Sequence, residues 1–146
     1  MADEIVYPNK RVLASQKTVL LVDDDEDILT LLEVLVHRDG FKILMAEDGL
    51  TALEKMKEKP DGMVLDLYMP GTDGFRVLES LRTMAGAPPV IVITGSPNAD
   101  DVSKASKSPL VQAVLKKPIR QNDLLAALHK ALNTVAAPPK PKKPED

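Results

Sequence analysis

The amino-acid sequence predicts an α/β domain in which one parallel sheet of five strands carries helices on both faces. Five short apolar runs recur along the chain, and each is followed by a segment with apolar residues at helical spacing. Turn residues and prolines separate the two kinds of segment. Because parallel strands must be joined by right-handed crossovers, five repeats of this alternation predict the doubly wound class of α/β fold.

The first two units cover the chain from residue 18 to about residue 58. A strand over residues 18–22 contains the run VLLV, which suits burial on both faces. The next helix starts in the acidic cluster at residues 23–27 and ends at Gly40, with an apolar stripe of Ile28, Leu31, Leu32, Leu35 and Val36. A second strand spans residues 41–45. A helix capped by Asp48 follows, with Leu50, Leu53 and Met56 on its inner face.

The third unit contains an apolar run, residues 63–65, that ends on Asp66. Turn residues at positions 70–74 stop this strand, and a helix over residues 75–84 follows with Phe75, Val77, Leu78 and Leu81 facing inward. In the fourth unit the run VIVI ends on Thr94, and the next helix, over residues 99–107, has Val102 as its only strong apolar residue. The fifth strand spans residues 111–115, and an amphipathic helix follows with Leu124, Leu125, Leu128 and Leu132.

Composition excludes several classes of protein. The chain of 146 residues has 44% hydrophobic and 28% charged residues, which is typical of a globular protein. Its net charge of −3 and its lack of a basic stripe argue against direct nucleic-acid binding. The absence of cysteine excludes disulfides and thiolate chemistry and suits a reducing compartment. With no apolar run long enough to span a membrane, we expect a cytoplasmic protein that does not bind membranes.

The sequence divides into a central domain and two flanking segments. We expect a loosely packed N-terminal extension over residues 1–16, a domain over residues 17–135, and a solvated Pro/Lys-rich tail or linker over residues 136–146. Too little chain follows the last helix for an effector domain. We therefore expect a stand-alone domain, although a fragment of a longer protein, with the tail as the start of a linker, remains an alternative.

Chemistry-bearing residues follow four of the five predicted strands. Parallel strands bring their carboxyl ends to one rim, so the residues expected together are Asp23, Asp24, Asp66, Thr94 and Lys117. Clustered carboxylates repel unless a cation neutralises them, and an all-oxygen set favours Mg²⁺ or Mn²⁺. Beside such an ion, Asp66 could attack a phosphoryl group while Lys117 and Thr94 stabilise its oxygens.

The segments LLVDDDEDI, MVLDLYMPGTDG, VIVITGS and LKKPI together resemble the receiver domain of two-component response regulators, over about residues 17–134. The resemblance implies a flavodoxin-like strand order, 2-1-3-4-5. It implies that Asp66 is the phospho-acceptor and that Asp23, Asp24 and Asp66 bind the metal together with the Tyr68 carbonyl. It also implies that Thr94 and Gly95 belong to the switch and that Lys117 contacts the phosphate.

The resemblance also implies partners and a reaction cycle. The phosphodonor would be a phosphohistidine on a histidine kinase or a phosphotransfer protein, and hydrolysis of the aspartyl phosphate would reset the switch. Output would pass to a downstream protein, and a phosphorylation-dependent dimer is compatible with the family. The cognate kinase, the downstream partner and the oligomeric state are not encoded in these motifs.

One position departs from the family pattern. The fifth strand carries Val114 where the family has a switch aromatic, three residues before Lys117. We therefore expect phosphorylation to be read out by backbone motion around Thr94, Gly95 and the weak fourth helix instead of by an aromatic rotamer change.

Two other functions remain as alternatives. A degenerate receiver would bind partners without being phosphorylated, and Val114 keeps this alternative open. A haloacid dehalogenase-type phosphatase would use Asp23 as its nucleophile in the pattern Asp23-x-Asp25, but Asp27 stands where that pattern wants a small hydroxyl residue or valine. His37 and His129 fall away from the predicted rim, and we interpret both as structural residues.

Overall fold

The computed structural model describes residues 11–69, 74–95 and 98–136 of the chain. In chain order its elements are β1 (Val12–Leu13), the 3-10 turn η1 (Ala14–Gln16), β2 (Thr18–Val22), α1 (Glu26–His37), β3 (Lys42–Ala46), α2 (Gly49–Lys55), η2 (Met56–Glu58), β4 (Gly62–Asp66), α3 (Gly74–Arg82), β5 (Val90–Thr94), α4 (Ala99–Ser106), β6 (Val111–Lys116), α5 (Gln121–Leu132) and β7 (Thr134–Val135).

Five of these strands form the central sheet, in the order β3-β2-β4-β5-β6, and every neighbouring pair is parallel. This is the order 2-1-3-4-5 once the sheet strands are counted from β2, so the predicted fold class and strand order are confirmed. After β3 the chain crosses back past β2 to form β4, and it then extends the sheet in the opposite direction. The carboxyl ends of β2 and β4 therefore lie side by side, at the point where an open α/β sheet binds ligands.

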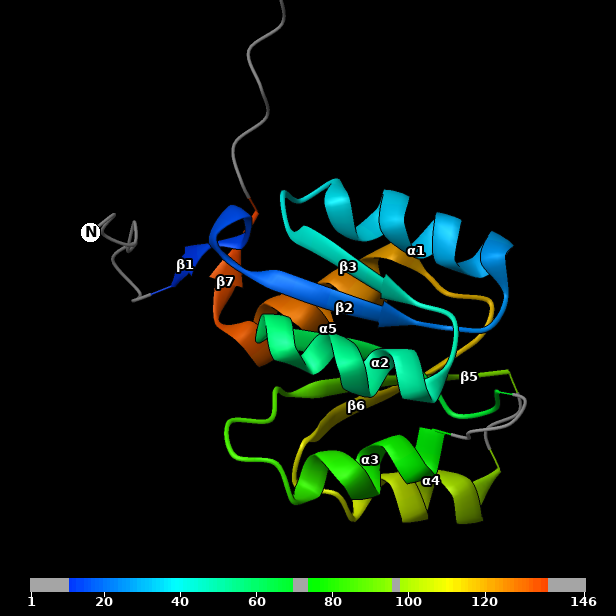
Figure 1. The fold of residues 1–146 in the computed structure, drawn as a ribbon. Helices are drawn as coiled ribbons and strands as arrows, with labels where there is room; N and C mark the ends of the chain where they lie inside the picture. The colour runs from blue at the N-terminus through cyan, green and yellow to red at the C-terminus, as the bar shows by residue number, and fades with distance from the viewer. Residues whose placement is uncertain (1–10, 70–73, 96–97, 137–146) are drawn as a thin grey trace, which may run out of the picture.

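Helices cover both faces of the sheet, as Figure 1 shows. Helices α1 and α5 share one core with residues such as Leu21 and Ile93, while α2, α3 and α4 share the other with residues such as Leu20 and Val92. Successive residues of β2 and β5 point to opposite faces and are buried on both. This burial explains why these strands appear as continuous apolar runs without alternation.

Aspartates fix the starts of α1 and α2. The carboxylate of Asp25 accepts from the backbone N–H groups of Asp27 and Ile28, and that of Asp48 accepts from Thr51 N–H at 2.7 Å. The hydrogen bond from Thr51 N–H lowers the pKa of Asp48, because it favours the charged carboxylate. Asp25 thus has a capping role that the acidic cluster conceals in the sequence.

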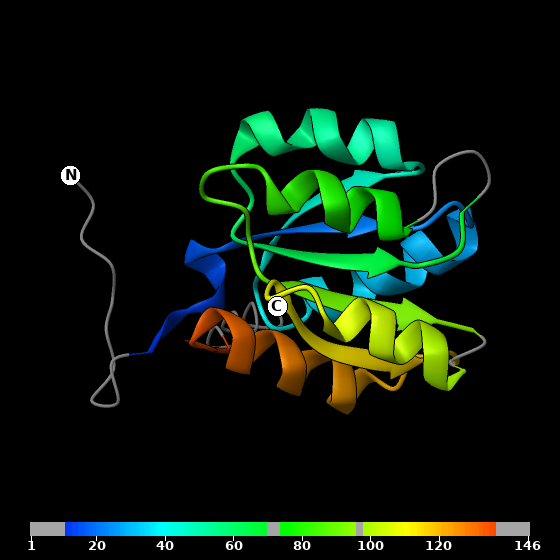
Figure 2. The ribbon, with the colours of Figure 1, turned by 90° about the horizontal axis from the view of Figure 1, so that it is seen from below.

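A second, two-stranded sheet corrects the prediction of loose packing before residue 17. Strand β1 pairs in parallel with β7, with Val12 opposite Thr134, and Val12, Leu13 and Ala14 are buried. The two strands are separated by almost the whole domain in sequence, so no local pattern could reveal their pairing. Figure 2 shows this pair at one end of the molecule, beside the last turn of α5.

His129 secures the same end of the molecule. Its Nδ1 lies 2.8 Å from Thr134 Oγ1 and its Nε2 lies 2.7 Å from Asp39 Oδ2, while its ring packs against Phe41 with centroids 5.2 Å apart. His129 therefore joins α5 to β7 and to the loop before β3, which fits the structural role predicted for it.

The helical spacing predicts that Leu31 and Leu50 face the core, and the structure shows that this prediction is wrong for both. Leu31 is 42% exposed and Leu50 is 67% exposed, whereas the buried positions of α1 are Leu29, Leu32 and Val36. Helix α1 is apolar over more than one face, and only packing against the sheet selects which stripe is buried.

Four segments lie outside the described residues. They hold the first ten residues of the predicted extension, the tail from residue 137, the turn residues Pro70, Gly71 and Asp73, and the Ser96–Pro97 turn predicted after the fourth strand. Within the described part of the chain, no helix combines the length and apolar character needed to cross a membrane.

Candidate functional site

The carboxyl ends of four neighbouring strands bring the predicted site residues to one rim. Asp23 follows β2, Asp66 is the last residue of β4, Thr94 is the last residue of β5, and Lys117 follows β6. The chain remains tied to the sheet at this rim, because Asp23 N–H donates to Ala46 O and Lys117 N–H donates to Thr94 O. The site thus rests on hydrogen-bonded strand ends.

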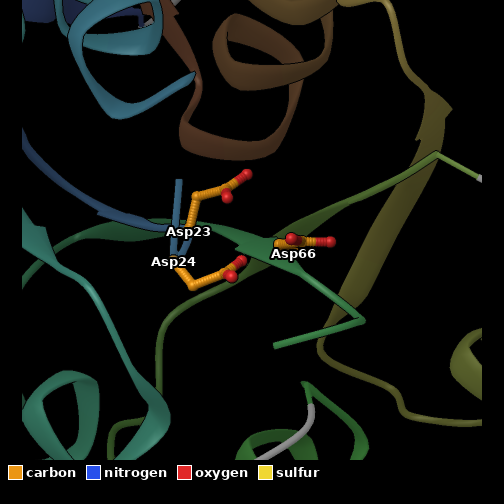
Figure 3. A group of neighbouring side chains, drawn as sticks. All are labelled: Asp23, Asp24 and Asp66. Atoms are coloured by element: carbon orange, nitrogen blue, oxygen red, sulfur yellow. The ribbon is translucent and has the colours of Figure 1, made fainter. Parts of the chain in front are cut away.

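Three carboxylates form an acidic cluster at this rim. Asp23, Asp24 and Asp66 each offer one oxygen, and these oxygens all lie within 4.8 Å of one another. Figure 3 shows Asp23 and Asp24 beside the end of β2 and Asp66 on the neighbouring strand. Asp23 is fully buried, Asp66 is 3% exposed, and Asp24 is exposed. The cluster therefore has a buried floor and one solvent-facing ligand.

Lys117 bridges the two buried carboxylates. Its Nζ lies 3.0 Å from Asp23 Oδ2 and 3.2 Å from Asp66 Oδ2. The remaining carboxylate oxygens are held by backbone groups, because Asp25 N–H donates to Asp23 Oδ1 and Tyr68 N–H donates to Asp66 Oδ1. One ammonium group thus faces three carboxylates, which leaves the cluster short of positive charge.

Burial and the neighbouring carboxylates together raise the pKa of Asp66 to about 6, from an ordinary value of 3.8. Burial is the largest cause and repulsion from Asp23 the second, while attraction to Lys117 acts in the opposite direction. Burial also opposes the charge on Lys117. Its hydrogen bonds and attraction to Asp23 and Asp66 nevertheless outweigh burial and raise its pKa, so Lys117 stays charged.

Glycine at position 74 allows α3 to begin directly against the backbone of Asp66. A Cβ atom there would lie 2.5 Å from the Asp66 carbonyl oxygen and 2.7 Å from Leu67 Cα, and Gly74 N–H donates to Leu67 O at 2.8 Å. In the sequence, Gly74 indicates only a turn after the third strand. Its closeness to Asp66 depends on a loop closure that no local pattern encodes.

The remaining predicted residues surround the acidic cluster. Thr94 is buried at the end of β5, and a Cβ atom on the exposed Gly95 would lie 3.9 Å from Lys117 Cδ. Tyr68 is 46% exposed just beyond Asp66. Val114 is half-buried, pairs with Val92, and packs against the core shared by α2, α3 and α4.

The residues present fit a divalent cation such as Mg²⁺. All side-chain donors of the cluster are carboxylate oxygens, which hard cations prefer, and they lie close enough to share one ion. The raised pKa of Asp66 comes first from its burial and then from repulsion by Asp23, and a bound cation would offset that repulsion. Asp23, Asp24 and Asp66 could therefore hold a metal ion.

Comparison with known proteins identifies the family. The family model described as response regulator receiver domain matches residues 19–129. The chain belongs to this family. The resemblance recognised from its motifs is therefore confirmed, and the rim of carboxylates, hydroxyl and lysine is the rim of a receiver domain.

Individual relatives carry the receiver domain within longer proteins. The chain is 35% identical over 123 residues to the alkaline phosphatase synthesis transcriptional regulatory protein PhoP of Bacillus subtilis, covering 75% of this chain and 51% of PhoP. It is 35% identical over 136 residues to protein-glutamate methylesterase/protein-glutamine glutaminase 5 of Myxococcus xanthus, covering 84% of this chain and 39% of that protein. The chain thus spans about half or less of these two relatives.

A solved structure has the same fold as this receiver domain. The chemotaxis protein CheY4 of Vibrio cholerae superposes with a TM-score of 0.74 at 24% identity, covering 80% of this chain and 98% of that chain. This likeness supports the fold independently of the sequence motifs.

Proposed function

We propose that this receiver domain is a phosphorylation-dependent switch in which Asp66 accepts a phosphoryl group from a phosphohistidine on a histidine kinase or phosphotransfer protein. The observation that carries the proposal is the placement of Asp66 between two further carboxylates and Lys117, at the carboxyl edge of the sheet. In the transfer, an Asp66 oxygen forms a bond to phosphorus as the phosphorus–nitrogen bond breaks, and the imidazole leaves and takes up a proton.

The neighbouring residues of this chain support such a transfer. Asp23, Asp24, Asp66 and the backbone carbonyl of Tyr68 would hold Mg²⁺ or Mn²⁺, which when bound would screen the negative charge of the phosphoryl oxygens. Lys117 Nζ already lies 3.2 Å from Asp66 Oδ2, so it can contact an oxygen of a phosphoryl group attached there. Thr94 and Gly95 would contact another phosphoryl oxygen from the end of β5.

Phosphorylation would then change the surface offered to a downstream protein. Because Val114 replaces the expected aromatic, we propose that the change passes through the backbone around Thr94 and Gly95 into α4. That helix suits such a role, since Ala105 is its only buried residue. Hydrolysis of the aspartyl phosphate would return the switch to its resting state.

The test is phosphorylation of the whole chain with Mg²⁺ and a small phosphodonor such as acetyl phosphate. We expect intact-mass spectrometry to show the addition of one phosphoryl group, which hydroxylamine removes and a chelator prevents. Asp66→Asn should abolish the labelling. The matched control Asp27→Asn, which changes an exposed acid of the same sequence cluster, should label normally.

Two outcomes would favour the alternatives. No labelling of the unmodified chain would favour a receiver that acts as an unphosphorylated adaptor, which Val114 also suits. Labelling that survives Asp66→Asn but disappears with Asp23→Asn would favour the dehalogenase-type chemistry, which family membership argues against.

A further inference from the structure

Helices α3 and α4 cover the same face of the sheet as α2 (Figure 1). Residues of α3, of α4 and of the turn after α4 line one groove. It has a volume of about 220 Å³. Its lining, which we call the α3–α4 groove, consists of Phe75, Leu78, Glu79, Arg82, Lys104, Lys107 and Ser108. The groove shares no residue with the acidic cluster, and Lys117 is not part of its lining.

Positive charge dominates the groove although the chain as a whole has a net charge of −3. Its lining offers the cations of Arg82, Lys104 and Lys107 against the single carboxylate of Glu79. The next acid along α4 is Asp101, whose Oδ2 already accepts from Asn98 Nδ2 at 2.9 Å. The groove is therefore a local basic surface on an acidic protein, and it favours an acidic partner.

The floor of the groove is apolar. Of the two apolar residues in its lining, Phe75 is half-buried and Leu78 is almost completely buried. Lys104 Nζ lies 4.2 Å from the centroid of the Phe75 ring, which places an ammonium group over an aromatic face. An apolar side chain could pack on this floor while carboxylates beside it pair with the surrounding cations.

We propose that the α3–α4 groove binds an acidic segment of a partner protein that inserts an apolar side chain against Phe75. The three cations supply the charge complementarity, and the hollow over Phe75 and Leu78 supplies the site for the anchor. A nucleic acid would also be attracted to the three cations, but it has no apolar side chain to pack against Phe75 and Leu78.

Both walls of the groove begin at the candidate phosphorylation site. Helix α3 starts at Gly74, which packs on the backbone of Asp66, and Phe75 is the next residue. Helix α4 follows β5 and its terminal Thr94 after a short connection. We therefore expect phosphorylation of Asp66 to change the affinity of the groove for its partner. This regulatory step, unlike the docking site itself, rests on the proposed function.

The direct test uses a synthetic helical peptide with glutamate on one face and leucine at anchor positions, titrated into the ¹⁵N-labelled whole chain. We expect amide shifts concentrated at Phe75, Leu78, Lys104 and Lys107, and weaker binding at higher salt concentration. Charge reversal by Lys104→Glu or Arg82→Glu should weaken the affinity about three- to tenfold. The matched control Lys57→Glu reverses an exposed lysine on another surface and should leave the affinity unchanged.

Several outcomes would overturn the docking site. They are the absence of saturable shifts, shifts centred on other elements, equal weakening by Lys57→Glu, and equal binding of a peptide with lysine in place of glutamate. Groove shifts with duplex DNA but not with the acidic peptide would replace the protein partner with a nucleic acid.

A second peptide titration uses the chain in the presence of Mg²⁺ and beryllofluoride, a phosphate analogue. It tests the regulatory step separately from the docking site. Equal peptide affinity with and without the phosphate analogue would overturn the regulatory step and leave the docking site standing. The mass-labelling assay at Asp66 reports on the proposed phosphorylation independently, because it does not involve the groove.

Discussion

Replacing Asp66 with asparagine should stabilise the metal-free protein at neutral pH. The carboxylate of Asp66 is 3% exposed and lies near Asp23, and these surroundings raise its pKa from 3.8 to about 6 even though Lys117 acts in the opposite direction. A pKa difference of this size corresponds to about 3 kcal/mol at a pH above both values. An uncharged amide avoids this cost, so we expect Asp66→Asn to raise the free energy of unfolding by about 1–3 kcal/mol at pH 7.5.

The pH dependence gives the sign of the effect. Between pH 4 and pH 6 the folded protein holds a proton at Asp66 that the unfolded chain has released, because the folded pKa is about 6 and the ordinary value is 3.8. The contribution of Asp66 to stability therefore falls as the pH rises through this window and is constant above it. The advantage of Asp66→Asn should accordingly vanish near pH 4, grow up to about pH 6, and level off.

Chemical denaturation with a chelator present, followed at several pH values, measures this difference. Asp27→Asn, at an exposed position, serves as the control and should change stability by less than about 0.5 kcal/mol. Adding Mg²⁺ should stabilise the unmodified chain more than Asp66→Asn and so shrink the difference. An Asp66→Asn variant that is no more stable at pH 7.5, or whose advantage is the same at pH 4 and pH 7, would refute this reasoning.

Two further predictions concern the rim, and a third concerns the end of the molecule that His129 secures. Lys117→Gln should raise the pKa of Asp66 above about 6, because the attraction that now lowers it is lost, and carboxyl ¹³C chemical shifts across a pH titration would measure this. Gly74→Ala should destabilise the fold by about 1–3 kcal/mol and slow labelling of Asp66, since its Cβ would collide with fixed backbone; unchanged thermal stability would count against it. His129→Ala should lower the free energy of unfolding, measured by urea denaturation, by about 1–3 kcal/mol, because its two side-chain hydrogen bonds are lost. The control His37→Ala, at the exposed end of α1, should change this free energy little. Equal effects of the two substitutions would contradict the anchoring role of His129.

The composition of the rim could be derived from the sequence because its signals are local. Each apolar run ends on the residue that matters, and parallel strands bring such ends together whatever the details of packing. This reasoning predicts Asp23, Asp66 and Thr94 on one edge of the sheet, and the structure has all three there.

The helix faces were harder to predict, because periodicity does not say which of two apolar stripes meets the sheet. Helix α1 has apolar residues on several sides, and contact with the sheet buries Leu29 while Leu31 stays exposed. The α3–α4 groove shows the same limit, since Phe75 and Lys104 lie on different helices and meet only in the folded chain.

The order of strands and helices, the residues at the strand ends and the family can all be recognised from the sequence, since these depend on neighbours along the chain. Three contacts are visible only in the folded chain: Lys117 bridges Asp23 and Asp66, Gly74 packs on the backbone of Asp66, and β1 pairs with β7. These contacts join segments that are apart in sequence, in the pairing of β1 with β7 by almost the whole domain. They form only when the chain closes around the sheet, and no local pattern in the sequence records them.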